Sequence, residues 1–311
     1  MTSVKCSDVE AEPLAGSAKE ETAYVLFESP GGWSRDVLDG DTFGEELTAK
    51  LKAKFAESGV GFQLIRRNGR RGRDVGKLRR CYLVWAKQQL MELVLLRGPE
   101  DVLDLDLSGP GKNSGEKIDG PLVLVCTHSK RDKCCAVKGR PLAARLTQKF
   151  PDSMVWESSH MKGHRFAPTV QLMPWAYSFG RLNDEAADQM VESARRGELF
   201  YPANRGRGIW SPQGQVAELA VARELITTGE AVPYGALQVE EPAAGDSEAE
   251  TTEVEAENAE SATAATVRVS HRDGRAWDVE LLSRVVDGIV ASCGKPPKSD
   301  TVWEAVRVSV A

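Results

Sequence analysis

The sequence predicts an α/β protein made of two similar halves, and three observations lead to this prediction. Short apolar runs typical of buried strands alternate with stretches that have the spacing of amphipathic helices. The same order of elements occurs twice, on either side of a Gly/Ser-rich stretch at residues 108–115. The chain has 311 residues, which at roughly 100 to 200 residues per domain suggests two domains.

In the first half, the residue pattern predicts one helix among four strands. Asp41 or Thr42 caps the helix, Gly59 ends it, and apolar residues recur in between at every fourth position. The predicted strands lie at residues 23–27, 62–65, 81–85 and 90–96. The resulting order, strand, helix, strand, strand, strand, matches a thioredoxin-like layer of helices on a mixed sheet.

The second half repeats this order. A strand at residues 121–125 precedes a helix from about residue 140 to 150, and a further element follows at 154–156. Pro174 separates two strands of a hairpin, and two terminal helices are predicted at 184–195 and 215–227. The predicted fold class is therefore α/β, with two tandem thioredoxin-like domains whose mixed sheets are flanked by helices, plus a short C-terminal β-rich tail.

The predicted boundaries give four segments. These are an N-terminal thioredoxin-like domain at residues 1–115, a second such domain at 116–237, an acidic disordered linker at 238–265, and a C-terminal β-rich docking segment at 266–311. The linker holds nine Asp and Glu and no Lys or Arg. In the docking segment, a hairpin turn at 271–274 and a final strand at 301–310 are expected.

The overall charge does not predict a partner. The net charge is −6, but without the nine acidic residues of the linker 40 basic side chains face 37 acidic ones. No stretch approaches the roughly 20 apolar residues that span a bilayer, so no membrane association is expected. The start of the sequence lacks the apolar run of a secretory signal, and we expect a cytoplasmic protein whose cysteines are thiols or metal ligands.

Cysteines and histidines cluster between residues 126 and 164. Read as ligands, they give Cys126-x8-Cys135 followed by His160-x3-His164, a set that suits zinc or an iron–sulfur cluster. Eight intervening residues are too many for the tight turn of a zinc knuckle. A 2Fe-2S cluster accepts ligands from separate longer loops, and two histidines can replace two cysteines on one iron. Gly163 and Pro168 indicate a loop around the histidines.

The other cysteines and His128 have plainer interpretations. A redox disulfide between the neighbours Cys134 and Cys135 would be strained. His128 is expected on the surface of a polar loop, with a hydrogen bond near the ligands as the other possibility. Isolated structural thiols are expected at Cys6, Cys81 and Cys293. The sequence shows no phosphate loop, serine-protease triad order, zinc-protease motif or carboxylate pair for sugar hydrolysis.

Three stretches carry a resemblance to a known family. Residues 125–136 read VCTHSKRDKCCA, residues 139–143 read GRPLA, and residues 156–167 read WESSHMKGHRFA. Together with CSD at 6–8, PLAG at 13–16 and SCG at 292–294, they resemble the sucrase/ferredoxin-like family of thioredoxin-like ferredoxins. The resemblance implies a 2Fe-2S cluster held in the second domain by two cysteines and two histidines.

Carried over residue by residue, the resemblance makes Cys126, Cys135, His160 and His164 the cluster ligands. Cys135 precedes the small residue Ala136, as the second cysteine of the family does. Cys134 is the alternative to Cys135. Adjacent residues of an extended chain point to opposite sides, so we expect Cys134 to pack behind the loop.

The expected function is one-electron transfer, with an unidentified redox protein as donor or acceptor, rather than hydrolysis. Neutral imidazole ligands raise the potential above that of an all-cysteine centre. A ring nitrogen open to water would couple proton transfer to reduction. The alternatives are a binding module stabilised by zinc in the same Cys2His2 set, and a thiol oxidoreductase that uses Cys134 or Cys135.

The segment at residues 66–80 holds eight Lys and Arg against one Asp. Its three glycines favour a solvated loop between strands. The second interpretation is a docking site for an acidic electron donor. Binding of nucleic acid is the third interpretation, because no aromatic residues are interleaved with the basic ones. A contact with the acidic linker is a further possibility.

Overall fold

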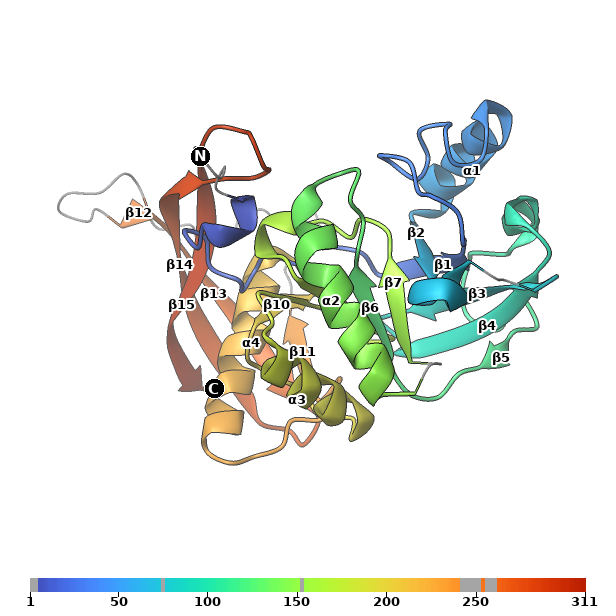
Figure 1. Ribbon diagram of the computed structural model, residues 1–311. Helices are drawn as coiled ribbons and strands as arrows, with labels where there is room; N and C mark the ends of the chain where they lie inside the picture. The colour runs from blue at the N-terminus through green and yellow to red at the C-terminus, as the bar shows by residue number, and fades with distance from the viewer. Residues whose placement is uncertain (1–4, 74–75, 152–153, 241–252, 255–261) are drawn as a thin grey trace.

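A computed structural model describes residues 5–73, 76–151, 154–240, 253–254 and 262–311. Its centre is a large mixed sheet with the strand order β10-β9-β8-β6-β7-β2-β1-β3-β4-β5. Helices cover this sheet, and a second, antiparallel sheet packs at one end of the molecule (Figure 1). The predicted α/β class is confirmed.

The first half contributes one end of the large sheet. Its elements are β1 (Ala23–Glu28), α1 (Glu45–Ser58), β2 (Gly61–Arg66), β3 (Arg79–Trp85), β4 (Leu90–Leu96) and β5 (Glu116–Lys117), with short 3-10 helices η1 (Cys6–Asp8), η2 (Gly69–Gly72) and η3 (Pro99–Asp104). Strand β1 pairs parallel with β2 and antiparallel with β3, which pairs antiparallel with β4.

The second half repeats this pairing. Its elements are β6 (Leu122–Cys126), α2 (Lys133–Lys149), β7 (Val155–Ser158), η4 (His164–Phe166), β8 (Thr169–Met173), β9 (Tyr177–Gly180), α3 (Asp184–Arg195), β10 (Asn204–Arg207) and α4 (Pro212–Thr227). Strand β6 pairs parallel with β7 and antiparallel with β8, which pairs antiparallel with β9. The order expected of a thioredoxin-like layer is therefore present in both halves.

The two halves form one continuous sheet, because β2 pairs antiparallel with β7. Side chains alternate between the faces of a strand, so Val123 and Val125 of β6 pack under α2, whereas Leu122 and Leu124 face the other way. This opposite face forms a core cluster shared with Tyr24 and other residues of the first half. The predicted boundary after residue 115 thus divides one sheet rather than two separate ones.

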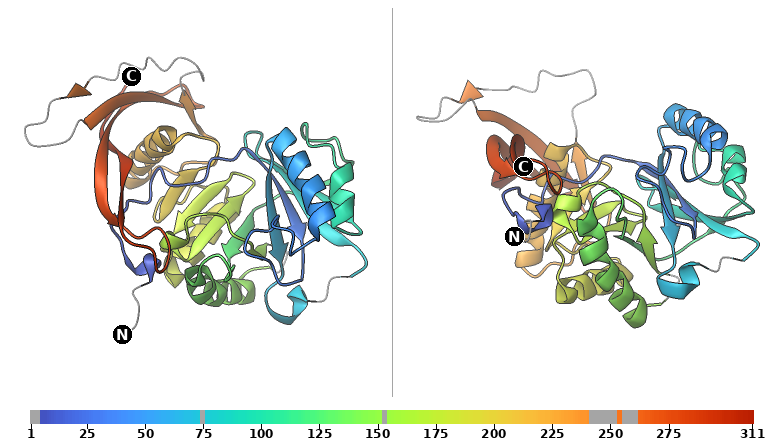
Figure 2. Two further views of the ribbon diagram at one scale, coloured as in Figure 1. Left: turned by 90° about the horizontal axis from the view of Figure 1, so that it is seen from above. Right: turned by 45° about the horizontal axis from the view of Figure 1, so that its top comes forward.

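The C-terminal segment is β-rich, as predicted. Strands β11 (Leu237–Glu240), β13 (Ala262–His271), β14 (Ala276–Ile289) and β15 (Lys298–Val310) form an antiparallel sheet in that order, and β12 (Glu253–Val254) pairs with β13. The sheet curves around α4 in Figure 2, and Val267 and Val279 share a core cluster with Val216 and Ala217 of that helix. Of the predicted linker, residues 238–240 and 262–265 lie in strands. Residues 241–252 and 255–261 lie outside the described residues.

Helix α2 begins seven residues earlier than the predicted start at residue 140. The Asp132 side chain caps it by accepting a hydrogen bond from the Cys134 amide. Gly139 and Pro141 disfavour a helix in isolation, but both lie inside α2. Gly139 is required by packing, because an added Cβ would lie 2.1 Å from the Cys126 carbonyl oxygen at the end of β6. Among the described residues, no helix combines the length and apolar character of a membrane span.

Candidate metal centre

Three of the four predicted ligands meet where β6 ends and α2 begins. Cys126 is the last residue of β6 and Cys135 lies in the first turn of α2, and both are buried. His160 follows β7, the parallel neighbour of β6. One donor atom from each of these three residues lies within 4.8 Å of the other two. Parallel pairing and the short β6–α2 connection therefore create a soft donor set.

The fourth predicted ligand, His164, lies beside this group. Its ring centroid is 5.3 Å from that of His160, and its side chain is 15% exposed. The Nε2 atom of His164 is 3.7 Å from Oδ2 of Asp132. Within the described residues, Nδ1 of both histidines lacks a hydrogen-bond partner, as does Nε2 of His164. The predicted loop around the histidines is present, since His160 lies in a loop and His164 begins the short η4.

Hydrogen bonds between the cysteines set their proton affinities in opposite directions. A hydrogen bond from Cys135, together with His160 and the backbone of His128, lowers the pKa of Cys126 well below its usual value in spite of burial. The hydrogen bond to Cys126, and then burial, raise the pKa of Cys135. These contacts favour the thiolate form at Cys126 over that at Cys135.

Cys134 does not join this donor set. Its Sγ lies 3.5 Å from Sγ of Cys6 and 3.3 Å from Sγ of Cys293, which are 3.7 Å from each other. The expectation of isolated thiols at Cys6 and Cys293 is wrong, and Cys81 lies apart in the core of the first half. Cys134 and Cys135 lie in a helical turn rather than in an extended chain, and they point into two different groups.

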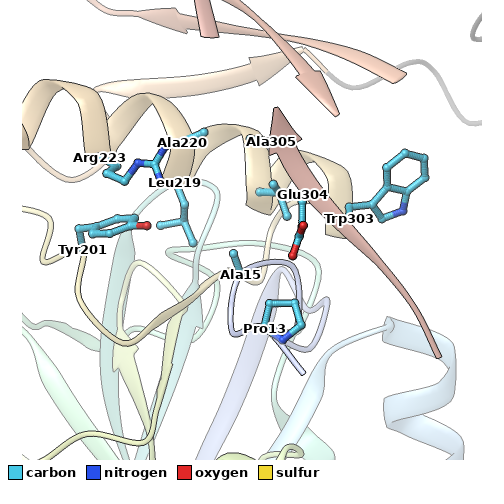
Figure 3. Close-up of a pocket in the computed structure, with 10 residues that line it drawn as sticks. Pro13, Ala15, Tyr201, Leu219, Ala220, Arg223, Trp303, Glu304 and Ala305 are labelled. Carbon is cyan, nitrogen blue, oxygen red and sulfur yellow. The ribbon is translucent and has the colours of Figure 1, made fainter. Parts of the chain in front are cut away.

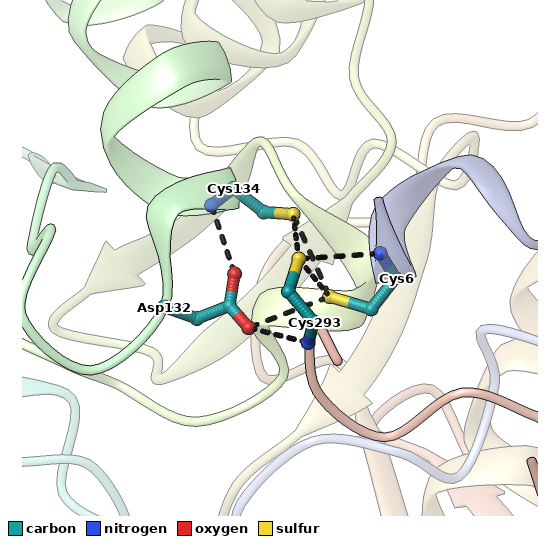
Figure 4. A group of neighbouring side chains, drawn as sticks. All are labelled: Cys6, Asp132, Cys134 and Cys293. Atoms are coloured by element: carbon teal, nitrogen blue, oxygen red, sulfur yellow. Dashed lines mark hydrogen bonds between the residues drawn. The ribbon is translucent and has the colours of Figure 1, made fainter. Parts of the chain in front are cut away.

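Asp132 belongs to the group formed by Cys6, Cys134 and Cys293 (Figure 4). Its carboxylate accepts hydrogen bonds from the amides of Cys134 and Cys293, at 2.9 and 2.8 Å, and from the Ser292 hydroxyl at 2.9 Å. Burial raises the pKa of Asp132, but these hydrogen bonds lower it by more, so the net shift is well below the ordinary value. A buried anion thus faces both His164 and the three thiols.

His128 is buried rather than exposed, contrary to the expectation for a polar loop. Its ring packs edge-on against Trp33 with the centroids 5.9 Å apart, and burial lowers its pKa. Its backbone, rather than its ring, contacts the Cys126 sulfur. The histidine therefore contributes to packing around the site.

The basic segment at 66–80 connects β2 and β3, and Arg73, Lys77 and Leu78 are exposed, as expected for a solvated loop. Arg66 forms an ion pair with the buried Glu157 at 2.8 Å, and its guanidinium lies 4.3 Å from the Trp33 ring centroid. Arg80 lies 3.6 Å from Glu28. These contacts tie the two ends of the segment to the sheet.

The structure also contains a hollow of about 250 Å³ between the N-terminal segment, α4 and β15 (Figure 3). Among the described residues that line it, Glu304 is the single carboxylate, and none is a cysteine or histidine. Glycoside hydrolysis uses a pair of carboxylates, so this hollow does not support a sugar-cleaving site.

The donor set suits metal binding better than thiol exchange. Cys126 and Cys135 are 0% and 1% exposed, and a thiolate that attacks a substrate disulfide must be reachable. Cys134 is fully buried as well. Two thiolates and two imidazoles, by contrast, are ligands that zinc and iron–sulfur clusters accept.

Two comparisons with known proteins gave no match, and a third gave one. The family model described as sucrase/ferredoxin-like matches residues 14–206 of the chain. No curated protein and no solved structure matches the chain at a significant level. The matched residues include all four predicted ligands, Cys134 and Asp132, whereas Cys6 and Cys293 lie outside them.

Proposed function

The chain belongs to the sucrase/ferredoxin-like family, and we propose that it transfers single electrons through a 2Fe-2S cluster held by Cys126, Cys135, His160 and His164. The meeting of Cys126, Cys135 and His160 within 4.8 Å, with His164 next to them, is the observation that carries this proposal. When bound, the cluster would supply one-electron oxidation and reduction.

The spread of the donors favours two irons over one ion. A tetrahedral zinc ion with bonds of about 2.0 to 2.3 Å needs its four donors within about 3.8 Å of one another. The donors of Cys126, Cys135 and His160 all lie within 4.8 Å of one another, but His164 does not join them, so the four donors together spread beyond a tetrahedral set. A pair of bridged irons can be reached by donors this far apart, because each iron needs only two of them.

The free ring nitrogens fit such a group. Nδ1 of both histidines lacks a hydrogen-bond partner among the described residues, although burial of an unpaired polar atom is unfavourable. Each ring therefore has a nitrogen that a metal could take, and the hydrogen bond between His160 and Cys126 places the His160 ring against the thiol pair. The Nε2 atom of His164 faces Asp132, the arrangement of carboxylate and metal-bound histidine that orients many such ligands.

The cysteine and histidine sides of the site differ in their access to water. Both cysteines are buried, whereas both histidines are partly exposed. Partly exposed imidazoles allow a ring proton to be exchanged with solvent, which supports proton-coupled transfer. They also place the histidine side nearest to the surface from which a redox partner can approach.

The partner is proposed to be a redox protein. A hollow of about 530 Å³ beside the site is lined by Arg66, Arg73 and Arg140, with Glu157 at its base. The Thr127 hydroxyl, next to Cys126, donates a hydrogen bond to Glu157. Positive charge so near the donor set favours a partner with an acidic surface. The described cysteines are all free thiols, which supports a reducing cytoplasm as the location.

The test is the spectrum of protein purified without oxygen. A cluster gives reddish-brown protein, and chemical reduction gives a paramagnetic signal with hyperfine coupling to two histidine nitrogens. Replacing His160 or His164 with Cys should retain the cluster and lower its potential, toward the value of about −400 mV found with four cysteines. Cys81→Ser is the matched control, because Cys81 is buried away from the site.

Colourless protein that contains zinc would contradict this proposal and support the binding module. A coloured protein without nitrogen coupling would contradict the assignment of the histidines.

A further inference from the structure

We propose that Cys6, Cys134 and Cys293 form a second metal site, a zinc ion bound by three thiolates with Asp132 as the fourth ligand (Figure 4). The site is distinct from the proposed cluster and uses none of its four ligands. It draws on three parts of the chain, namely η1, the start of α2, and the loop between β14 and β15.

The sulfur positions fit one ion. The three Sγ atoms form a nearly regular triangle with sides of 3.3, 3.5 and 3.7 Å. The centre of such a triangle is about 2.0 Å from each sulfur, so an ion about 1.1 Å above its plane has the zinc–sulfur distance of about 2.3 Å. This is close to the geometry of one face of a tetrahedral site.

Asp132 offers a donor on the same side. Oδ2 of Asp132 lies 3.7 Å from Sγ of Cys6, and the four donor atoms all lie within 4.8 Å of one another. The Asp132 side chain is 1% exposed. Two amides and a hydroxyl donate to this buried carboxylate, and a cation bound beside it would compensate its negative charge.

Burial raises the pKa of the Cys6 and Cys293 thiols, so a metal must displace their protons, but two backbone features would stabilise the thiolates once they form. The Cys6 amide donates a hydrogen bond to Sγ of Cys293 at 3.4 Å, as it would to a thiolate. Cys134 lies in the first turn of α2, where the helix dipole stabilises negative charge. Lys138 holds the N-terminal segment in place, with Nζ 3.0 Å from the Ser7 carbonyl oxygen and 2.8 Å from Asp8.

Other uses of the three thiols fit less well. Each iron of a 2Fe-2S cluster takes two protein ligands, so three sulfurs that all lie 3.3 to 3.7 Å from one another exceed what one iron of such a cluster can accept. A disulfide would join two sulfurs at about 2.05 Å and leave the third beside Asp132. A single thiophilic ion engages all three.

The position of the site gives it a structural role. It ties the N-terminal segment and the β14–β15 loop to the turn that carries Cys134 and Cys135. It also fixes Asp132, whose Oδ2 faces Nε2 of His164. Metal bound here would therefore fasten the N-terminal segment and the β14–β15 loop to the start of α2.

The test measures zinc and iron separately in the full-length protein, produced with both metals in the medium. Wild type and the control Cys81→Ser should contain about one zinc per chain, whereas Cys6→Ser and Cys293→Ser should contain at least fivefold less. Iron should stay within the range of the control in both variants, because neither residue belongs to the cluster set. X-ray absorption at the zinc edge of the wild type should show three sulfurs near 2.3 Å and one oxygen near 2.0 to 2.2 Å.

Three results would overturn the proposal. The first is wild-type protein with less than about a tenth of a zinc per chain or with a disulfide among the three cysteines. The second is zinc unchanged in Cys293→Ser. The third is an absorption spectrum with two sulfurs and two nitrogens, which would place zinc in the set of Cys126, Cys135 and the histidines. The wild-type spectrum decides the question even if a variant fails to fold, and the iron content reports on the proposed function independently.

Discussion

Replacing Gly139 with Ala tests whether close contact between α2 and β6 holds the two ligand cysteines together. The added Cβ would lie 2.1 Å from the Cys126 carbonyl oxygen. An ordinary contact needs more than 3 Å, so the helix or the strand end must move by about 1 Å. In an open helix, Ala in place of Gly stabilises by about 1 kcal/mol. Overpacking costs about 1–3 kcal/mol, so we expect a net loss of up to about 2 kcal/mol.

The assay combines urea unfolding, followed by circular dichroism, with the iron content of the purified protein. Gly139→Ala should lower the urea midpoint and reduce bound iron, because the clash lies between Cys126 and the helix that carries Cys135. Gly109→Ala is the control, since nothing lies within 4 Å of its added Cβ, and its effect should stay within about 0.5 kcal/mol. A stabilised Gly139→Ala with full iron content would refute the reasoning.

Three further predictions follow from the site and the sheet junction. Cys135→Ser should lose most of its iron, whereas Cys134→Ser should keep it, and iron analysis showing the reverse would exchange their assignments. The reduction potential should fall by up to about 59 mV per pH unit above the imidazole pKa of the oxidised centre, because reduction strengthens proton binding at the imidazole. A reduction potential that stays constant in voltammetry between pH 6 and 10 would exclude proton coupling. Glu157→Gln should destabilise by about 1–3 kcal/mol in urea unfolding, because buried Glu157 accepts hydrogen bonds from Arg66, Asn68 and Thr127. Glu46→Gln is the control, because the Glu46 side chain is 86% exposed, and it should change the free energy of unfolding by less than about 0.5 kcal/mol. An equal loss of stability in the two variants would contradict the role of Glu157.

Local patterns were enough to predict most elements. The helix at 184–195 and the strand at 90–96 match α3 and β4 at both ends, because turn residues and apolar periodicity mark them clearly. The start of α2 was predicted too late. Packing of Gly139 against β6 and the cap at Asp132 outweigh the low helix propensity of Gly139 and Pro141, and the predicted spacing of apolar residues covered only the later turns.

Long-range contacts were beyond the sequence patterns. The pairing of β2 with β7 joins strands about 90 residues apart, and each strand alone has only the pattern of a buried segment. The meeting of Cys126, Cys135 and His160 was predicted because their spacing and the family resemblance both indicated it.

The convergence of Cys6, Cys134 and Cys293 was missed, because they are separated by 128 and 159 residues. A signal was nevertheless present. Cys134 was expected to pack behind the loop unless it replaced Cys135, and two other cysteines without a ligand role lay near the ends of the chain. Unassigned thiols of this kind are candidates for a shared site.

The central claim is that these four side chains hold two bridged irons. The most direct measurement is the content of iron and acid-labile sulfide in protein purified without oxygen. We predict about two irons and two sulfides per chain, both lost together in Cys126→Ser. Iron without labile sulfide, or about one metal ion per chain at these four residues, would contradict the account.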